Sequence, residues 1–118
     1  MMNFLRGNAA AKLDASEAIA KLAKGEITVL DVREPNEVAA SGSALGGVQI
    51  PLSMVPLMAN PQGPDYDARF DPNKPVAVFC AVGRRAEMAT QALKRMGYEA
   101  HNIGGFNDWT AAGGPVKR

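Results

Sequence analysis

The chain has 118 residues, of which 47% are hydrophobic and 21% charged, and its 13 basic and 12 acidic residues leave a formal net charge of +1. A chain of this length fits one domain with one core. We therefore predict a single domain over residues 1–118, with residues 1–11 as a flexible N-terminal segment. The charge is too small and too evenly spread to indicate a nucleic-acid or membrane-surface partner.

Cysteine and histidine are scarce in this sequence. With one of each, the chain cannot form an intrachain disulfide or the usual zinc clusters of cysteine and histidine ligands. A lone free cysteine favours a reducing compartment, and we expect the cytoplasm. No apolar run is long enough for a membrane helix, and the start of the chain lacks the pattern of a secretory signal.

The predicted elements alternate between helices and strands. Asp14 and Glu17 form a capping-box pattern that starts the first helix, and runs of β-branched apolar residues predict buried strands. Residues 53–74 hold four prolines and are expected to be loop, with one helical turn near Met54 to Met58. In chain order, the predictions are a helix (14–24), a strand (27–32), a short helix (34–40), a short strand (47–50), a strand (75–80), a helix (84–96), a strand (98–103) and a final helical turn led by residues 104–109.

Strands separated by helices and long connections predict an α/β fold. Such chains form a parallel sheet with right-handed crossovers and helices on both faces. In these sheets, sites form at the edge where the strands end. Asp31, Arg33 and Cys80 all lie at predicted strand ends, so we expect them at one edge.

The residues Cys80-Ala81-Val82-Gly83-Arg84-Arg85 connect a buried strand to a helix. Unpaired N–H groups at a helix N-terminus favour negative charge, and glycine permits the positive φ that a tight cradle needs. Cysteines in such positions have pKa values lowered from about 8.5 to between about 3.5 and 7.5. We therefore expect a reactive thiolate at neutral pH, beside two arginines suited to bind an oxyanion such as thiosulfate.

Each of these residues also has a simpler interpretation. A free cysteine is often an inert core residue. The two arginines could be exposed, or be paired with Glu34, Glu37 or Glu87. The order of strand, cysteine, glycine, paired arginines and helix favours a functional cysteine, and this interpretation requires an opening from solvent to the thiol.

Four motifs, in order along the chain, resemble those of the rhodanese family. They are its active-site loop (residues 80–86), its strand-ending motif (30–35), its glycine, isoleucine and proline segment (42–52), and its C-terminal signature (104–116). Ser43 and Ala44 replace the histidine and isoleucine common in the third motif, which we interpret as a changed structural contact. The resemblance covers the chain from about Lys12 onward and implies a central five-stranded parallel sheet.

The resemblance also implies an activity, which is transfer of sulfane sulfur through a cysteine persulfide without metal or organic cofactor. The Cys80 thiolate would take sulfur from thiosulfate or a persulfide and pass it to a thiol or cyanide. Ala81, Val82, Gly83, Arg84 and Arg85 would bind the substrate. The partners are then a small-molecule donor and acceptor, with a protein acceptor and the oligomeric state left open.

Other residues receive weaker expectations. For Asp31 and Arg33, support of the loop and an ordinary ion pair at a strand end are equal alternatives. His101 is expected to be structural or on the surface, and Phe106 and Trp109 to anchor the core. The methionines at positions 54 and 58 line the pocket mouth or fill the core.

Two other classes compete with a sulfurtransferase. A cysteine phosphatase or arsenate reductase relative would use a similar cradle that is one residue longer and ends in arginine. Here the arginine comes five residues after Cys80 and Ala86 comes six after, which favours sulfur over phosphate. A non-enzymatic sulfur carrier or interaction module with the same fold stays possible as the second rival.

Overall fold

A computed structural model describes residues 13–118 of the chain. The segment predicted to be flexible, residues 1–11, lies outside the described residues. In chain order, the elements are α2 (Ala15–Ala23), β1 (Thr28–Asp31), α3 (Pro35–Ser41), β2 (Ser43–Ala44), β3 (Val48–Gln49), the 3-10 helix η1 (Leu52–Met54), α4 (Val55–Met58), β4 (Val76–Cys80), α5 (Arg84–Arg95), β5 (Ala100–Gly105), α6 (Phe106–Ala111) and β6 (Val116–Lys117).

The centre of the fold is a parallel sheet with strand order β3-β1-β4-β5, and β2 and β6 form a separate antiparallel pair. The predicted α/β architecture is confirmed. The strand count differs from the five expected, because the main sheet has four strands within residues 13–118. The proline-rich connection between α4 and β4 adds no strand, and Ser43–Ala44 pairs with Val116–Lys117 instead of the main sheet.

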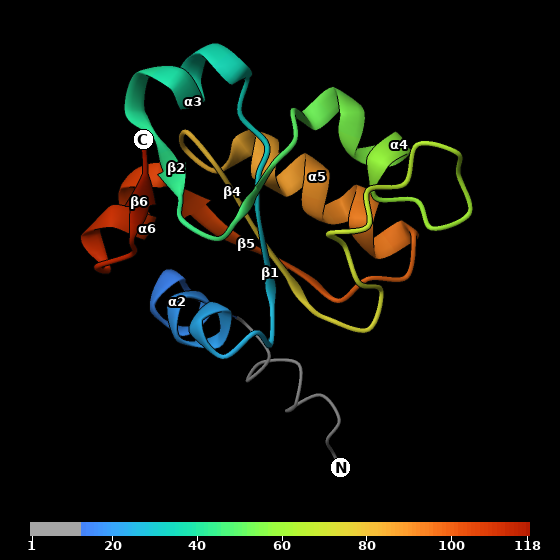
Figure 1. Cartoon of the computed structure of the whole chain (residues 1–118), viewed down its shortest axis with the longest axis horizontal. Helices are drawn as coiled ribbons and strands as arrows, with labels where there is room; N and C mark the ends of the chain where they lie inside the picture. The colour runs from blue at the N-terminus through green and yellow to red at the C-terminus, as the bar shows by residue number, and fades with distance from the viewer. Residues whose placement is uncertain (1–12) are drawn as a thin grey trace.

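Side chains from the buried strands alternate between two hydrophobic clusters, one on each face of the sheet. Leu30, Val78 and Cys80 pack under α4 and α5, whereas Phe79 packs under α2 and α6. Figure 1 shows α4 and α5 on one side of the strands and α2 and α6 on the other. Helices on both faces were predicted, and this prediction is confirmed.

The last strand of the sheet is displaced from its predicted position. We expected residues 98–103, but β5 covers Ala100–Gly105. A register shift after Val78 lets β4 pair with the two glycines that end β5, so that Cys80 lies opposite Gly105. This pairing brings the glycines against the loop that follows β4.

Three local features agree with the sequence patterns. The Asp14 carboxylate accepts the Glu17 N–H at 2.9 Å, which completes the expected capping box of α2. Gly83 has φ +101 at the start of α5, a left-handed conformation that favours glycine. No helix within residues 13–118 combines the length and apolar character needed to cross a membrane.

Candidate active site

The C-terminal edge of the sheet brings together the residues predicted to meet there. In the pairing of β1 with β4, Asp31 lies opposite Phe79, the neighbour of Cys80. Arg33 follows two residues after Asp31 and is buried beside it. The prediction that these three polar residues share one edge is therefore confirmed.

The segment from Cys80 to Ala86, here called the Cys80 loop, folds around the sulfur atom. The Gly83 N–H donates to Cys80 Sγ at 2.9 Å, and the Ala86 N–H donates at 3.3 Å. Gly83 directly precedes α5, and Ala86 lies in its first turn. N–H groups at the start of a helix stabilise negative charge on the sulfur. Of the residues predicted to hold the anion, Gly83 makes this contact, and Ala86 adds a donor that was not predicted.

The thiol is enclosed more completely than the sequence suggested. Cys80 is 0% exposed and belongs to the core cluster with Leu30 and Val78. The expected opening to solvent is thus absent from this conformation, and the view of Cys80 as a core residue is also correct. Val82, two residues after Cys80, is 79% exposed.

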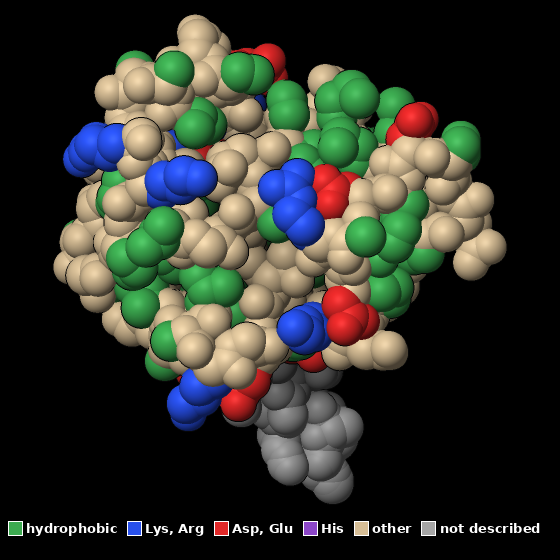
Figure 2. Space-filling model, viewed as in Figure 1, with side chains coloured by type: hydrophobic (Ala, Val, Ile, Leu, Met, Phe, Trp, Pro, Cys, Tyr) green, Lys and Arg blue, Asp and Glu red, His purple; other side chains and the backbone are tan. Residues whose placement is uncertain are grey.

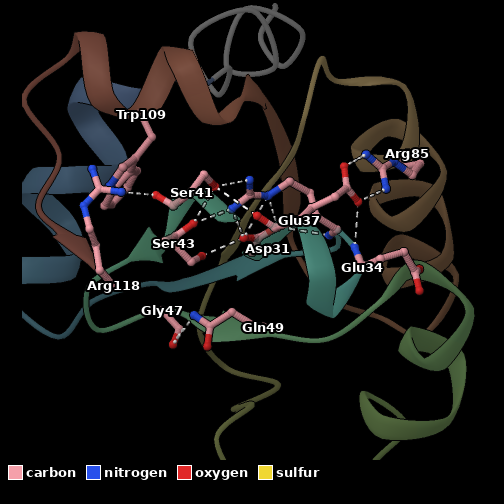
Figure 3. Close-up of polar contacts among 12 residues, drawn as sticks. Asp31, Glu34, Glu37, Ser41, Ser43, Gly47, Gln49, Arg85, Trp109 and Arg118 are labelled. Carbon is pink, nitrogen blue, oxygen red and sulfur yellow. Dashed lines mark hydrogen bonds and ion pairs between the residues drawn. The ribbon is translucent and has the colours of Figure 1, made fainter. Parts of the chain in front are cut away.

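Arg85 forms a bidentate ion pair with Glu37 of α3. The two guanidinium nitrogens lie 2.6 and 2.8 Å from the carboxylate oxygens. Hydrogen bonds from Arg85 are the main reason that the pKa of Glu37 falls to about 2, and the Glu34 N–H adds to the effect. Figure 3 shows the pair bridging α3 and α5. Arg85 was predicted to bind substrate, and the structure realises the alternative pairing with Glu37.

This ion pair gives a testable pH dependence. Because the pKa of Glu37 is about 2 in the folded chain and 4.5 ordinarily, the pair stabilises the fold fully above about pH 4.5 and loses its effect as pH falls to about 2. Urea unfolding should give a higher free energy of unfolding for wild type than for Glu37→Gln at neutral pH. The two free energies of unfolding should converge as the pH falls toward 2. A difference that stays constant with pH would contradict the assignment.

Arg84 faces the opposite side of the Cys80 loop. It is exposed and lines an open pocket of about 540 Å³ together with Val82, Glu87 and Asn102. The Asn102 amide donates to the Gly83 carbonyl at 3.0 Å and to Glu87 at 3.2 Å. Asn102 therefore holds the residue whose N–H points at the sulfur, a role that the sequence did not indicate.

Asp31 and Arg33 form a buried ion pair, with side chains 1% and 5% exposed. The Arg33 guanidinium donates to both Asp31 oxygens, and its carbon lies 4.5 Å from the centre of the Phe106 ring. It also donates to Ser41 Oγ and to the Gly42 carbonyl, each at 2.8 Å. The pair therefore fixes the C-terminal end of α3 to the end of β1 (Figure 3).

The effect of this pair on the Cys80 loop is indirect. The side-chain hydrogen bonds of Asp31 and Arg33 that we find among residues 13–118 are with each other, with the end of α3 and with β2, and not with the loop. The helix α3 also carries Glu37, whose carboxylate pairs with Arg85 of the Cys80 loop. The buried Asp31–Arg33 pair is therefore linked to the loop through α3. The structure shows the ion pair at the strand end, and support of the loop by this pair stays a prediction.

Comparison with known proteins identifies the family. A model of the rhodanese-like domain matches residues 14–112. The chain belongs to the rhodanese-like domain family. It is 31% identical over 96 residues to a human thiosulfate:glutathione sulfurtransferase, a match that covers 75% of this chain and 83% of that protein. It is also 31% identical over 101 residues to a putative sulfur carrier protein of Bacillus subtilis, covering 84% of this chain and 45% of that longer protein.

Solved structures share the rhodanese-like fold. A Thermoplasma volcanium rhodanese-related protein superposes with a TM-score of 0.68 at 29% identity, covering 90% of this chain and 96% of that one. A Rhodopseudomonas palustris protein of unknown function, described as a possible tyrosine phosphatase, gives a TM-score of 0.78 at 30% identity, covering 95% of this chain and 89% of that one.

The departure from the family pattern at Ser43 and Ala44 is a structural contact. Ser43 Oγ donates to the Asp31 carboxylate at 2.6 Å, and Ala44 pairs with Val116. In this rhodanese-like domain, a serine hydroxyl therefore supplies one partner of the buried carboxylate.

The remaining predictions concern residues around the site. His101 lies inside β5, away from the strand end, and its Nε2 is 2.8 Å from the carboxylate of Glu99. Trp109 is fully buried and stacks on the sheet, and Phe106 packs against the same cluster, as expected for core anchors. Met58 packs against the core, whereas Met54 is 39% exposed. Figure 2 shows hydrophobic side chains gathered at the surface in the region of α4.

Gly105 is the second residue whose importance the sequence did not indicate. A Cβ atom on Gly105 would lie 2.2 Å from the Ala81 carbonyl oxygen, so the loop backbone rests directly on this glycine. Within residues 13–118, no group of three or more His, Cys, Asp or Glu side chains is arranged to hold a metal ion. The chemistry available at this site is that of a sulfur atom surrounded by backbone donors.

Proposed function

We propose that this rhodanese-like domain is a sulfurtransferase that carries sulfane sulfur as a persulfide on Cys80. One observation carries the proposal: two N–H groups at the start of α5 donate to Cys80 Sγ, at 2.9 and 3.3 Å. Donors in this position favour the thiolate before reaction, and afterwards they favour the anionic persulfide. Similarity to a sulfurtransferase and to a sulfur carrier supports the same chemistry.

The first step is displacement at sulfur. The Cys80 thiolate attacks the outer sulfur of thiosulfate, a new S–S bond forms, and the original S–S bond breaks with its electron pair leaving on sulfite. With a persulfide donor, the leaving group is the donor's thiolate. One sulfur atom moves, and the total charge is the same on both sides.

The second step returns the cysteine to its thiolate. A thiol or cyanide acceptor attacks the outer sulfur of the Cys80 persulfide, and the Cys80 thiolate leaves. No metal or organic cofactor takes part in this scheme. Because a free thiol persists under reducing conditions, we place this activity in a compartment such as the cytoplasm.

The residues of the Cys80 loop have distinct parts in the proposal. Gly83 and Ala86 hold the sulfur, and the exposed residues Ala81 and Val82 move to admit the donor. Arg84 and Arg85 are at the rim, where Arg85 contacts a donor only after leaving Glu37. A phosphatase would need an arginine directed at the bound phosphate, so the Arg85–Glu37 pair counts against that rival.

A sulfur carrier is the second candidate. The complete burial of Cys80 favours it, because a protected persulfide survives until a partner protein collects it. Carrier and enzyme share the Cys80 persulfide and differ in turnover. Repeated formation of thiocyanate from cyanide at a low protein concentration indicates an enzyme, whereas a single turnover per chain indicates a carrier.

Intact-mass analysis tests the proposal. Wild type and Cys80→Ser are each incubated with thiosulfate and, separately, with cysteine persulfide. We expect an adduct of one sulfur atom on wild type with at least one donor, its removal by cyanide, and no adduct on Cys80→Ser. Labelling of both proteins, or of neither with either donor, would overturn the proposal, as would hydrolysis of an aryl phosphate ester in place of sulfur transfer.

A further inference from the structure

Among residues 13–118, the guanidinium at the rim of the Cys80 loop next to α3 is that of Arg85, and it is paired. Arg85 is bound to Glu37 through two short hydrogen bonds. The hydrogen bonds to Glu37 are the main cause that raises the pKa of Arg85, and the charges of Cys80 and of Glu34, the residue that precedes α3, add smaller contributions. This side of the rim therefore has two carboxylates and one guanidinium group.

The other side of the loop is also acidic. The pocket lined by Arg84 is also lined by the acidic residues Asp14, Glu87 and Asp108. Arg33, the remaining nearby guanidinium, is neutralised by its buried partner and does not change the balance. Among the described residues around the Cys80 loop, five carboxylates thus face two guanidinium groups, although the whole chain has a formal net charge of +1.

We infer that this rim selects against doubly negative donors such as thiosulfate, and that the site takes its sulfur from an organic persulfide of lower negative charge. The inference rests on the proposed sulfur transfer and narrows its donor class. The Cys80 thiolate attacks the outer sulfur of the persulfide, and the donor's own thiolate leaves with the electron pair of the broken S–S bond. A dianion would have to approach a negative rim without help from Arg85.

Glu37 is the residue that sets this preference. Its carboxylate occupies the edge of the Arg85 guanidinium formed by the two terminal nitrogens, one of the edges that could bind an oxyanion, and it balances the positive charge of that group. In water, a unit charge about 10 Å from an approaching anion changes the anion's encounter rate with the site. Removing that charge changes the rate by about threefold to fourfold for a dianion and by about twofold for a monoanion. Neutral reagents are unaffected, which separates the charge effect from a change in loop structure.

The sign of the salt dependence is the first test. For wild type, kcat/KM with thiosulfate is expected to rise as ionic strength increases from about 0.01 to about 0.1 M, because the Debye length falls from about 30 to about 10 Å and screens the repulsion. The same value for cysteine persulfide, which carries one net negative charge, is expected to rise less. A fall in kcat/KM for thiosulfate with added salt would overturn the inference.

Substitution of Glu37 is the second test, with a readout that does not depend on sulfur transfer. Iodoacetate is negatively charged and iodoacetamide is neutral, so the ratio of their alkylation rates at Cys80 reports the charge at the rim. Glu37→Gln at low salt is expected to raise this ratio about twofold and to raise kcat/KM for thiosulfate about threefold. Glu26→Gln removes an exposed carboxylate before β1, at the opposite edge of the sheet, and should leave both values unchanged.

The outcomes distinguish the two proposals. If neither donor forms an adduct on wild type, the proposed sulfur transfer fails, while the alkylation ratio still measures the rim. If adducts form but Glu37→Gln leaves the ratio unchanged or lowers it, the charge inference fails and sulfur transfer stands. A lower iodoacetamide rate alone would show that the loop has moved, and the wild-type salt dependence then decides.

Discussion

Replacing Arg33 with leucine is expected to lower the free energy of unfolding by about 3 to 5 kcal/mol. The substitution leaves the Asp31 carboxylate without its cation at a position where the side chain is 1% exposed. It also removes the donors to Ser41 and Gly42 that fix the end of α3. Urea unfolding monitored by tryptophan fluorescence measures the change, because Trp109 lies in the core.

The chain contains a matched control for this prediction. Arg69 and Asp67 have the same two-residue spacing and the same contacts between guanidinium and carboxylate, but Arg69 is 57% exposed. Arg69→Leu is expected to cost at most about 1 kcal/mol, since exposed ion pairs contribute little. Equal losses for the Arg33 and Arg69 variants would show that burial of the Asp31–Arg33 pair has no special energetic role.

Replacing Gly105 with alanine is expected to slow persulfide formation about 100-fold, since displacement by about 1 Å has effects of that size on catalytic geometry. The added Cβ would lie 2.2 Å from the Ala81 oxygen and 2.9 Å from its carbonyl carbon. The loop backbone must therefore shift, and with it the Gly83 N–H that donates to the sulfur. Single-turnover labelling followed by mass spectrometry measures the rate.

Gly63→Ala is the control for this substitution. A Cβ atom there would meet nothing closer than 3.4 Å, so the rate of persulfide formation should equal that of wild type. Circular dichroism and unfolding curves of both variants show whether the fold is retained, because overpacking alone costs about 1 to 3 kcal/mol. A Gly105→Ala protein that keeps the wild-type rate would mean that the loop position is not critical.

The main elements could be predicted because their signals are local. The apolar run that ends at Cys80 is buried on both faces, and the pattern that starts at Asp14 caps its helix through neighbouring residues. The position of Cys80 between a buried strand and a helix was enough to predict backbone N–H donors around its sulfur. In each case, the residues that decide the structure lie within about one turn or one strand of each other.

The features that could not be predicted depend on contacts between distant parts of the chain. The β2–β6 pair joins two-residue segments at Ser43 and Lys117, too short to give any periodic signal. Arg85 and Glu37 are 48 residues apart, so the sequence offered three possible partners without a way to choose. The enclosure of the thiol depends on how the loop packs on Gly105, which only the register of β4 and β5 determines.

The enclosure of Cys80 also has a kinetic consequence. Because its side chain has no exposed surface, every reagent must wait for an excursion of the chain that uncovers it. The frequency of these excursions sets the same upper limit on the reaction rate of Cys80 with donors, alkylating agents and oxidants, whatever their intrinsic reactivity. At saturating concentrations, chemically unrelated reagents would therefore converge on a single maximal rate, and a stored sulfur atom would outlast one held in the open.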